Sequence, residues 1–166
     1  FGTKPIVFVA PGSVWATKRW TVEGFKKLVR ETEERNCQVI LVGSSDEKPL
    51  CEEIQNETSE AVNLAGETSF LETIRLFETG QVLVSNDSGA MHLAAVANLP
   101  VVSIFGPTTL SLGYRPWVQE SVVVQKPLSC RPCGKHGHQK CPIGTHDCMK
   151  KVKVDDVAPH VEFYSS

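Results

Sequence analysis

The residues from Val84 to Leu93 carry the group of side chains best suited to chemistry. Asp87, Ser88 and Gly89 follow a short apolar run and precede small residues that favour a helix. A helix N-terminus presents unpaired backbone N–H groups and about half a positive charge, so it can bind a phosphate. Gly89 would let the backbone approach such a group, Ser88 could donate to it, and His92 lies on the same face. The alternative is that Asp87 or Ser88 only caps the helix.

A second polar group follows the first apolar run of the chain. Lys18 and Arg19 are adjacent and lie between Trp15 and Trp20, and Ser13 adds a hydroxyl to the same stretch. Two neighbouring cations in a loop suit the neutralisation of a diphosphate. The alternative is a solvated pair of surface charges.

Two further polar residues come directly after predicted strands. Glu47 could accept hydrogen bonds from a ribose diol, although an exposed acidic residue at the start of a helix is the commoner explanation. Thr68 closes the short stretch after another strand. The chain has no Gly-x-Gly-x-x-Gly after its first strand and no Walker loop, which argues against a standard dinucleotide or P-loop site.

The hydrophobic pattern predicts the elements that would position these residues. Short continuous apolar runs are typical of strands buried on both faces, and segments of helical period separate them. This alternation predicts an α/β fold with a Rossmann-like, doubly wound, mostly parallel sheet. The loops after the strands would then share the carboxyl edge, where open α/β sheets bind ligands. The predicted strands are 5–10, 38–42, 61–64, 82–85, 101–105 and 122–125, and the predicted helices are 22–36, 49–56, 70–77 and 90–98.

Two helices carry more specific predictions. Ser69 followed by Glu72 predicts a capping box at the start of a helix. Its expected apolar face is Phe70, Ile74 and Phe77. Residues 154–166 predict only a short helix, because Pro159 and the end of the chain interrupt it. The apolar side chains expected to be exposed there are Val157, Val161, Phe163 and Tyr164.

The length, composition and charge exclude several classes of protein. With 166 residues and 41% hydrophobic residues, the chain can form one globular domain with its own core and is not disordered, fibrous or repetitive. A formal charge of −2 argues against a nucleic-acid partner. No stretch approaches the roughly 18 apolar residues of a membrane span, and the first residues lack the layout of a signal peptide. We therefore expect a soluble, cytoplasmic protein.

The cysteines are concentrated in a segment of unusual composition, residues 126–148, called the Cys-rich segment below. The pair Cys130 and Cys133 has the spacing of half a zinc site, while Cys141 and Cys148 form a looser second half. Structural zinc, one or two disulfides and free thiols all fit this spacing. Because several lysines lie nearby, a zinc module that binds nucleic acid is a further alternative.

Four motifs follow one another along the chain. They are Pro11-Gly12 with Thr17-Lys18-Arg19-Trp20, then Asn63-Leu64-Ala65-Gly66-Glu67-Thr68, then Asn86-Asp87-Ser88-Gly89-Ala90-Met91-His92, then Phe105-Gly106-Pro107-Thr108. Together they resemble the second half of the ADP-heptose lipopolysaccharide heptosyltransferases, glycosyltransferase family 9, and the heptosyltransferase II type in particular. The likeness covers about residues 5 to 125. Many family members carry a similar cysteine insert.

The resemblance implies a GT-B glycosyltransferase, of which residues 1–166 would be the C-terminal, nucleotide-sugar-binding domain and the N-terminal acceptor domain would be absent. Lys18 and Asp87 would be its catalytic residues here. By the same resemblance, the residue roles would be the following: Lys18 on the diphosphate and sugar, Glu47 on the ribose, Thr68 at the nucleoside, Asp87 on heptose hydroxyls, Ser88 and Gly89 on the phosphates, and His92 in support. The chain departs from some members where Val14 follows Ser13, since these have two hydroxyl residues there.

The implied reaction is an inverting transfer that requires no cofactor, in which a hydroxyl of the lipid A core attacks ADP-heptose and ADP leaves. Lys18, Arg19 and the helix dipole would stabilise the leaving diphosphate. The general base would come from the absent domain, so the isolated chain is expected to bind nucleotide without turnover. The full protein could touch the inner face of the inner membrane. Two alternatives stay open: a non-catalytic nucleotide-sugar-binding module and a GT-B enzyme that uses another nucleotide sugar.

Overall fold

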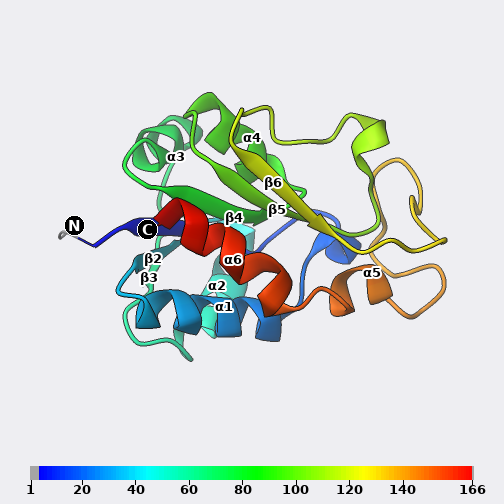
Figure 1. Cartoon of the computed structure of the whole chain (residues 1–166), viewed down its shortest axis with the longest axis horizontal. Helices are drawn as coiled ribbons and strands as arrows, with labels where there is room; N and C mark the ends of the chain where they lie inside the picture. Colours follow the sequence, from blue (N-terminus) through cyan, green and yellow to red (C-terminus); the bar gives the residue numbers. More distant parts are fainter. Residues whose placement is uncertain (1–3, 166) are drawn as a thin grey trace.

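The computed structural model describes residues 4–165 as a single parallel sheet covered by helices on both faces (Figure 1). The sheet has six strands in the order β3-β2-β1-β4-β5-β6, and every neighbouring pair is parallel. The strands are β1 (Ile6–Ala10), β2 (Gln38–Leu41), β3 (Val62–Asn63), β4 (Val82–Asn86), β5 (Val101–Phe105) and β6 (Ser121–Gln125). The predicted doubly wound fold is confirmed, and the sheet is wholly parallel.

Two groups of helices cover the sheet. In Figure 1, α3 and α4 lie over one face and α1, α2 and α6 over the other. The α-helices are α1 (Val22–Glu34), α2 (Lys48–Gln55), α3 (Phe70–Phe77), α4 (Gly89–Val96), α5 (Asp147–Lys150) and α6 (Val154–Ser165). The 3₁₀ turns are η1 (Ala16–Lys18), η2 (Ser45–Glu47) and η3 (Leu110–Leu112). In the described part of the chain, no helix has the length and apolar character needed to cross a bilayer.

The central strands show why the apolar runs are continuous. All five residues of β1 are buried. Successive side chains point to opposite faces, so Val7 and Val9 pack with α1 and α6 while Phe8 and Ala10 pack with α3 and α4. A strand covered on both faces must be apolar at every position.

Helix α3 follows the prediction at its start but not along its apolar face. Ser69 and Glu72 form the predicted capping box. Phe77 is fully buried, but Phe70 is 78% exposed, so its assignment to the packed apolar face of the helix was wrong. In a βαβ unit the helix runs against the strands, so the first turn of α3 lies at the carboxyl edge of the sheet. There Phe70 borders a cavity instead of the core.

The C-terminal helix corrects a second prediction. Helix α6 has 12 residues and continues through Pro159 to Ser165. Val157 and Val161 are buried and belong to the core shared with α1, so the expectation that they are exposed was wrong. Burial of this apolar stripe outweighs the cost of a proline within the helix. Phe163 is exposed, as predicted.

Candidate functional site

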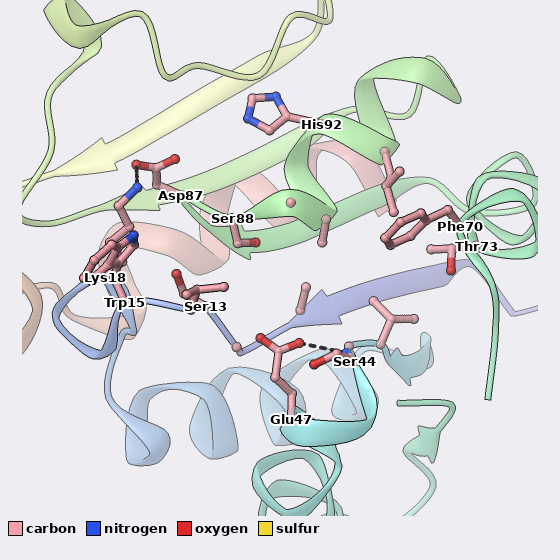
Figure 2. Close-up of a pocket in the computed structure, with 18 of the residues that line it drawn as sticks. Ser13, Trp15, Lys18, Ser44, Glu47, Phe70, Thr73, Asp87, Ser88 and His92 are labelled. Atoms are coloured by element: carbon pink, nitrogen blue, oxygen red, sulfur yellow. Dashed lines mark hydrogen bonds and ion pairs between the residues drawn. The ribbon is translucent and has the colours of Figure 1, made fainter. Parts of the chain in front are cut away.

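A cavity of about 620 Å³ opens at the carboxyl edge of the sheet, where the strand order reverses between β1 and β4 (Figure 2). This reversal is the position at which open α/β sheets bind ligands. All the predicted binding residues except Arg19 line the cavity: Ser13, Lys18, Glu47, Thr68, Asp87, Ser88, Gly89 and His92. The fold therefore brings together side chains from four different loops.

A buried ion pair forms one end of the cavity. The Nζ of Lys18 lies 2.7 Å from Oδ2 of Asp87, and the two side chains are 7% and 3% exposed. The hydroxyl of Thr108 donates to the same carboxylate oxygen at 2.6 Å. Lys18 also lies 4.9 Å from the centroid of the Tyr114 ring, within the range of a cation–π contact. Because Oδ2 takes both donors, Oδ1 of Asp87 can accept from a ligand hydroxyl.

The N-terminus of α4 forms the adjacent wall. Ser88 occupies the N-cap position, but its side chain makes no capping hydrogen bond and instead pairs with Ser85 at 3.0 Å. The carboxylate of Asp87 is directed to Lys18 and Thr108. The capping alternative for these two residues was therefore wrong. A Cβ added at Gly89 would meet nothing within 4 Å, so a ligand can approach the backbone there.

Glu47 lies on the opposite wall (Figure 2). Its Oε2 accepts the backbone N–H of Ser44 at 2.8 Å, which completes a capping box at the start of η2. Its Oε1 lies above the backbone of Gly12, where an added Cβ would be only 2.0 Å away. The residue therefore lies at a helix start, as the simpler explanation held, but it is half-buried and not exposed, and it still presents a carboxylate oxygen to the cavity.

The other end of the cavity is more apolar. Phe70, Val42 and Leu93 line it, and the hydroxyls of Thr68 and Thr73 meet there at 2.9 Å. Figure 2 shows Phe70 and Thr73 together at this end, far from the Lys18 and Asp87 pair. An apolar surface beside hydroxyl groups suits a flat heterocycle with polar edges.

Arg19 supports the loop and is not among the residues that line the cavity. Its Nε donates to the carbonyl of Ser13 at 2.8 Å. His92 lines the cavity as an exposed side chain on α4. Figure 2 shows its ring beyond Ser88, at the rim.

Sequence reasoning gave no role to Asn86, which organises the site. Its fully buried side chain accepts the N–H of Trp20 at 2.9 Å and donates to the carbonyls of Pro11 and Gly12 at 2.8 and 3.1 Å. One amide thereby fixes both ends of the loop that carries Lys18. The available signal was the two polar residues, Ser85 and Asn86, that end an otherwise apolar strand.

The cysteines are all free. Within residues 4–165 no three His, Cys, Asp or Glu side chains are arranged to hold a metal ion, so the set Cys130, Cys133, Cys141 and Cys148 has no metal-binding geometry. Burial raises the pKa of Cys148 to about 11. Backbone N–H groups, that of His146 first, lower the pKa of Cys141.

An open parallel sheet with a polar and apolar cavity at its switch point defines a Rossmann-like ligand-binding domain. Residues 1–143 match the sequence model of glycosyltransferase family 9 (heptosyltransferase), and the chain belongs to this family. Family 9 includes the enzymes that transfer heptose to the lipopolysaccharide or lipooligosaccharide core.

Curated relatives match over part of their length. Lipooligosaccharide heptosyltransferase 2 of Campylobacter jejuni (serotype O:2) is 31% identical over 160 residues, which cover 93% of this chain and 49% of the relative. Lipopolysaccharide heptosyltransferase 2 of Escherichia coli K12 is 31% identical over 112 residues, which cover 64% and 32%. The chain thus spans about half, or less, of the length of these relatives.

Solved structures show the same fold. The E. coli ADP-heptose lipopolysaccharide heptosyltransferase II matches with a TM-score of 0.82 at 24% identity, over 99% of this chain and 47% of that one. The E. coli heptosyltransferase WaaC with ADP matches with a TM-score of 0.76 at 17% identity, over 97% and 44%. The chain therefore has the fold of one half of these GT-B structures.

Proposed function

We propose that this chain is the nucleotide-sugar-binding domain of a heptosyltransferase and that it binds ADP-heptose for inverting transfer to the lipopolysaccharide inner core. The observation that carries this proposal is one cavity that joins the uncapped start of α4 to the buried pair of Lys18 and Asp87. Family membership and the relatives named above support the choice of donor.

The two ends of the cavity assign the parts of the donor. The phosphates lie against the first-turn N–H groups of α4 and the hydroxyl of Ser88, because that end offers donors and a favourable dipole. The ribose faces Glu47, and the adenine lies between Phe70 and the hydroxyls of Thr68 and Thr73.

The sugar end carries the chemistry. Oδ1 of Asp87 accepts from heptose hydroxyls, while Lys18 lies beside the bond that breaks. As the acceptor hydroxyl attacks the anomeric carbon, the bond to ADP breaks and negative charge grows on the diphosphate. Lys18 and the α4 dipole stabilise that charge in a site already organised before the reaction. The transfer needs no cofactor.

The second half of the enzyme supplies what this chain does not. We assign residues 1–166 to the C-terminal domain and the acceptor, a sugar of the lipid A core, to an N-terminal domain that also provides the general base. The whole protein would then act on the cytoplasmic side of the inner membrane. It follows that this chain alone binds nucleotide and does not turn over.

A thermal-shift series with ADP-heptose, ADP, UDP and GDP tests the proposal. A ligand at 100 times its dissociation constant adds about 2.7 kcal/mol of stability, so ADP and ADP-heptose should raise the melting temperature while UDP and GDP do not. A larger shift with UDP or GDP would assign the site to another nucleotide sugar. Heptose transfer by the isolated chain would overturn the division of roles between the two domains.

A further inference from the structure

The Cys-rich segment, residues 126–148, makes several hydrogen bonds to one residue of the loop that carries Lys18, namely Thr17. The backbone N–H of Thr17 donates to the carbonyl of His138 at 3.0 Å, its hydroxyl donates to that carbonyl at 2.7 Å, and the N–H of His138 donates back to the hydroxyl at 2.8 Å. The ring of His146 donates to the carbonyl of Thr17 at 2.8 Å. Every one of these partners belongs to the segment, and Thr17 is only 4% exposed.

The opposite end of the segment holds the loop after β5. The guanidinium of Arg131 donates to the carbonyls of Gly106 and Thr108, the latter at 2.8 Å. The N–H of Cys133 donates to the carbonyl of Pro107 at 2.9 Å. Thr108 in turn donates its hydroxyl to Asp87, so this loop carries the second partner of the carboxylate.

The middle of the segment packs between the two loops. A Cβ added at Gly137 would lie 3.2 Å from the hydroxyl oxygen of Thr17, 3.4 Å from Cγ of Lys18 and 3.2 Å from Cγ of Pro107. Gly137 has φ of +87°, which favours glycine. The ring of His138 also donates to the carbonyl of Cys133, which links the two ends of the segment.

Both partners of Asp87 therefore rest on the same segment. Lys18 and Thr108 come from loops after different strands, β1 and β5, and a buried carboxylate is costly when its partners drift away. We propose that the Cys-rich segment is a brace that positions Lys18 and Thr108 on Asp87, with Thr17, His146 and Arg131 as positioning residues. Its effect on the donor rests on the proposed function; its effect on Lys18 does not.

A third contact reaches the cavity wall. Nδ1 of His136 lies 2.8 Å from the hydroxyl of Tyr114, and the ring of Tyr114 lies against Lys18. The ring of Trp15, which lines the cavity, is nearly parallel to that of His136, with centroids 6.4 Å apart. The brace thus also orients the aromatic surface beside the ion pair.

Acylation of Lys18 tests the brace without any ligand. An amine-reactive acetyl ester is added to the full chain, and the rate at Lys18 is followed by peptide mass spectrometry. Thr17→Val removes the hydroxyl with its two hydrogen bonds, and the rate should rise about tenfold. Thr17→Ser keeps the hydroxyl and should restore the slow rate. Thr58→Val removes a hydroxyl that donates to the carbonyl of Gln55, the last residue of α2, outside the cavity lining, and should leave the rate at Lys18 unchanged.

A second variant keeps the test informative if Thr17→Val does not fold. Gln139 is an exposed residue of the segment whose amide binds the N–H of Ala16 and the carbonyl of Val14. Gln139→Ala should raise the rate at Lys18 about threefold. Unchanged acylation of Lys18 in both Thr17→Val and Gln139→Ala would overturn the brace, whether or not the chain binds nucleotide.

Ligand titration separates the brace from the proposed function. His146→Ala should weaken ADP about tenfold and leave adenosine unchanged, because the diphosphate end alone depends on Lys18. His160→Ala on α6 is the matched control. Equal weakening of ADP and adenosine would indicate general loosening and would overturn the positioning role. A wild-type chain that binds no ADP would overturn the proposed function, while the acylation result would still decide the brace.

Discussion

The two ends of the cavity are built on different principles. At one end, Lys18 and Asp87 are buried and held by partners from three loops. At the other end, Phe70 is 78% exposed, and on the wall opposite α4 the Oε2 of Glu47 accepts the N–H of Ser44 while its Oε1 faces the cavity. A fixed end suits charge stabilisation during a reaction, since donors already in place need not reorganise. An open end suits binding of a group that takes no part in the reaction.

The largest effect is expected where the fixed end is broken. Lys18→Ala leaves the carboxylate of Asp87 buried without its cation, and the free energy of unfolding should fall by about 3 kcal/mol in a urea titration. Lys27→Ala removes an exposed ammonium opposite Glu31 and should cost almost nothing. Equal losses of unfolding free energy in the two variants would mean that the buried pair stabilises the fold no more than a surface ion pair does.

Two capping boxes allow a test of the wall opposite α4. Glu47→Ala and Glu72→Ala each remove the glutamate of a capping box, and both should lower stability by a similar small amount. Only Glu47 lines the cavity, so only its loss should weaken adenosine, by about tenfold in a calorimetric titration. If Glu72→Ala weakens adenosine equally, the ribose assignment fails.

Two adjacent exposed side chains at the start of α3 test the apolar surface. Phe70 borders the cavity and is 78% exposed, and Leu71 is 76% exposed but is not part of the lining. Phe70→Ala should weaken ADP about fivefold because a stacking surface is lost. Leu71→Ala should leave the affinity unchanged, and neither variant should alter the melting temperature. Retention of full affinity in Phe70→Ala would move the adenine elsewhere.

The thiols should differ in reactivity without affecting stability. Backbone N–H bonds lower the pKa of Cys141, whereas burial raises that of Cys148 to about 11 and that of Cys51 to about 12. The thiolate reacts, so iodoacetamide should modify Cys141 first and at a lower pH than the other two. Peptide mass spectrometry at pH values from about 6 to about 10 would show the order in which the three thiols are modified. Prior modification of Cys148 would contradict these environments.

The fold of this molecule could be predicted from the sequence better than its side-chain contacts could. The apolar strands, the helices between them and the loops at one edge follow from local periodicity, which burial on both faces of a sheet imposes. The cluster of Ser13, Lys18, Glu47, Asp87 and Ser88 was predicted because the topology brings those loops together.

What escaped prediction depends on contacts between distant residues. The pairing of Lys18 with Asp87, the amide of Asn86 and the exposure of Phe70 depend on where separate loops meet. The same holds for α6, since the core shared with α1 extends a helix that local propensity would end at Pro159.

The positions of the three tryptophans give the protein its own optical reporter. Trp15 lines the cavity, Trp20 is buried with its indole N–H bonded to the carbonyl of Val152, and Trp117 is 70% exposed. Emission from Trp15 should therefore change as a ligand enters, while Trp20 reports whether the turn before α6 remains joined to the first loop. Occupancy and integrity can thus be followed in unlabelled protein, by substituting one indole at a time.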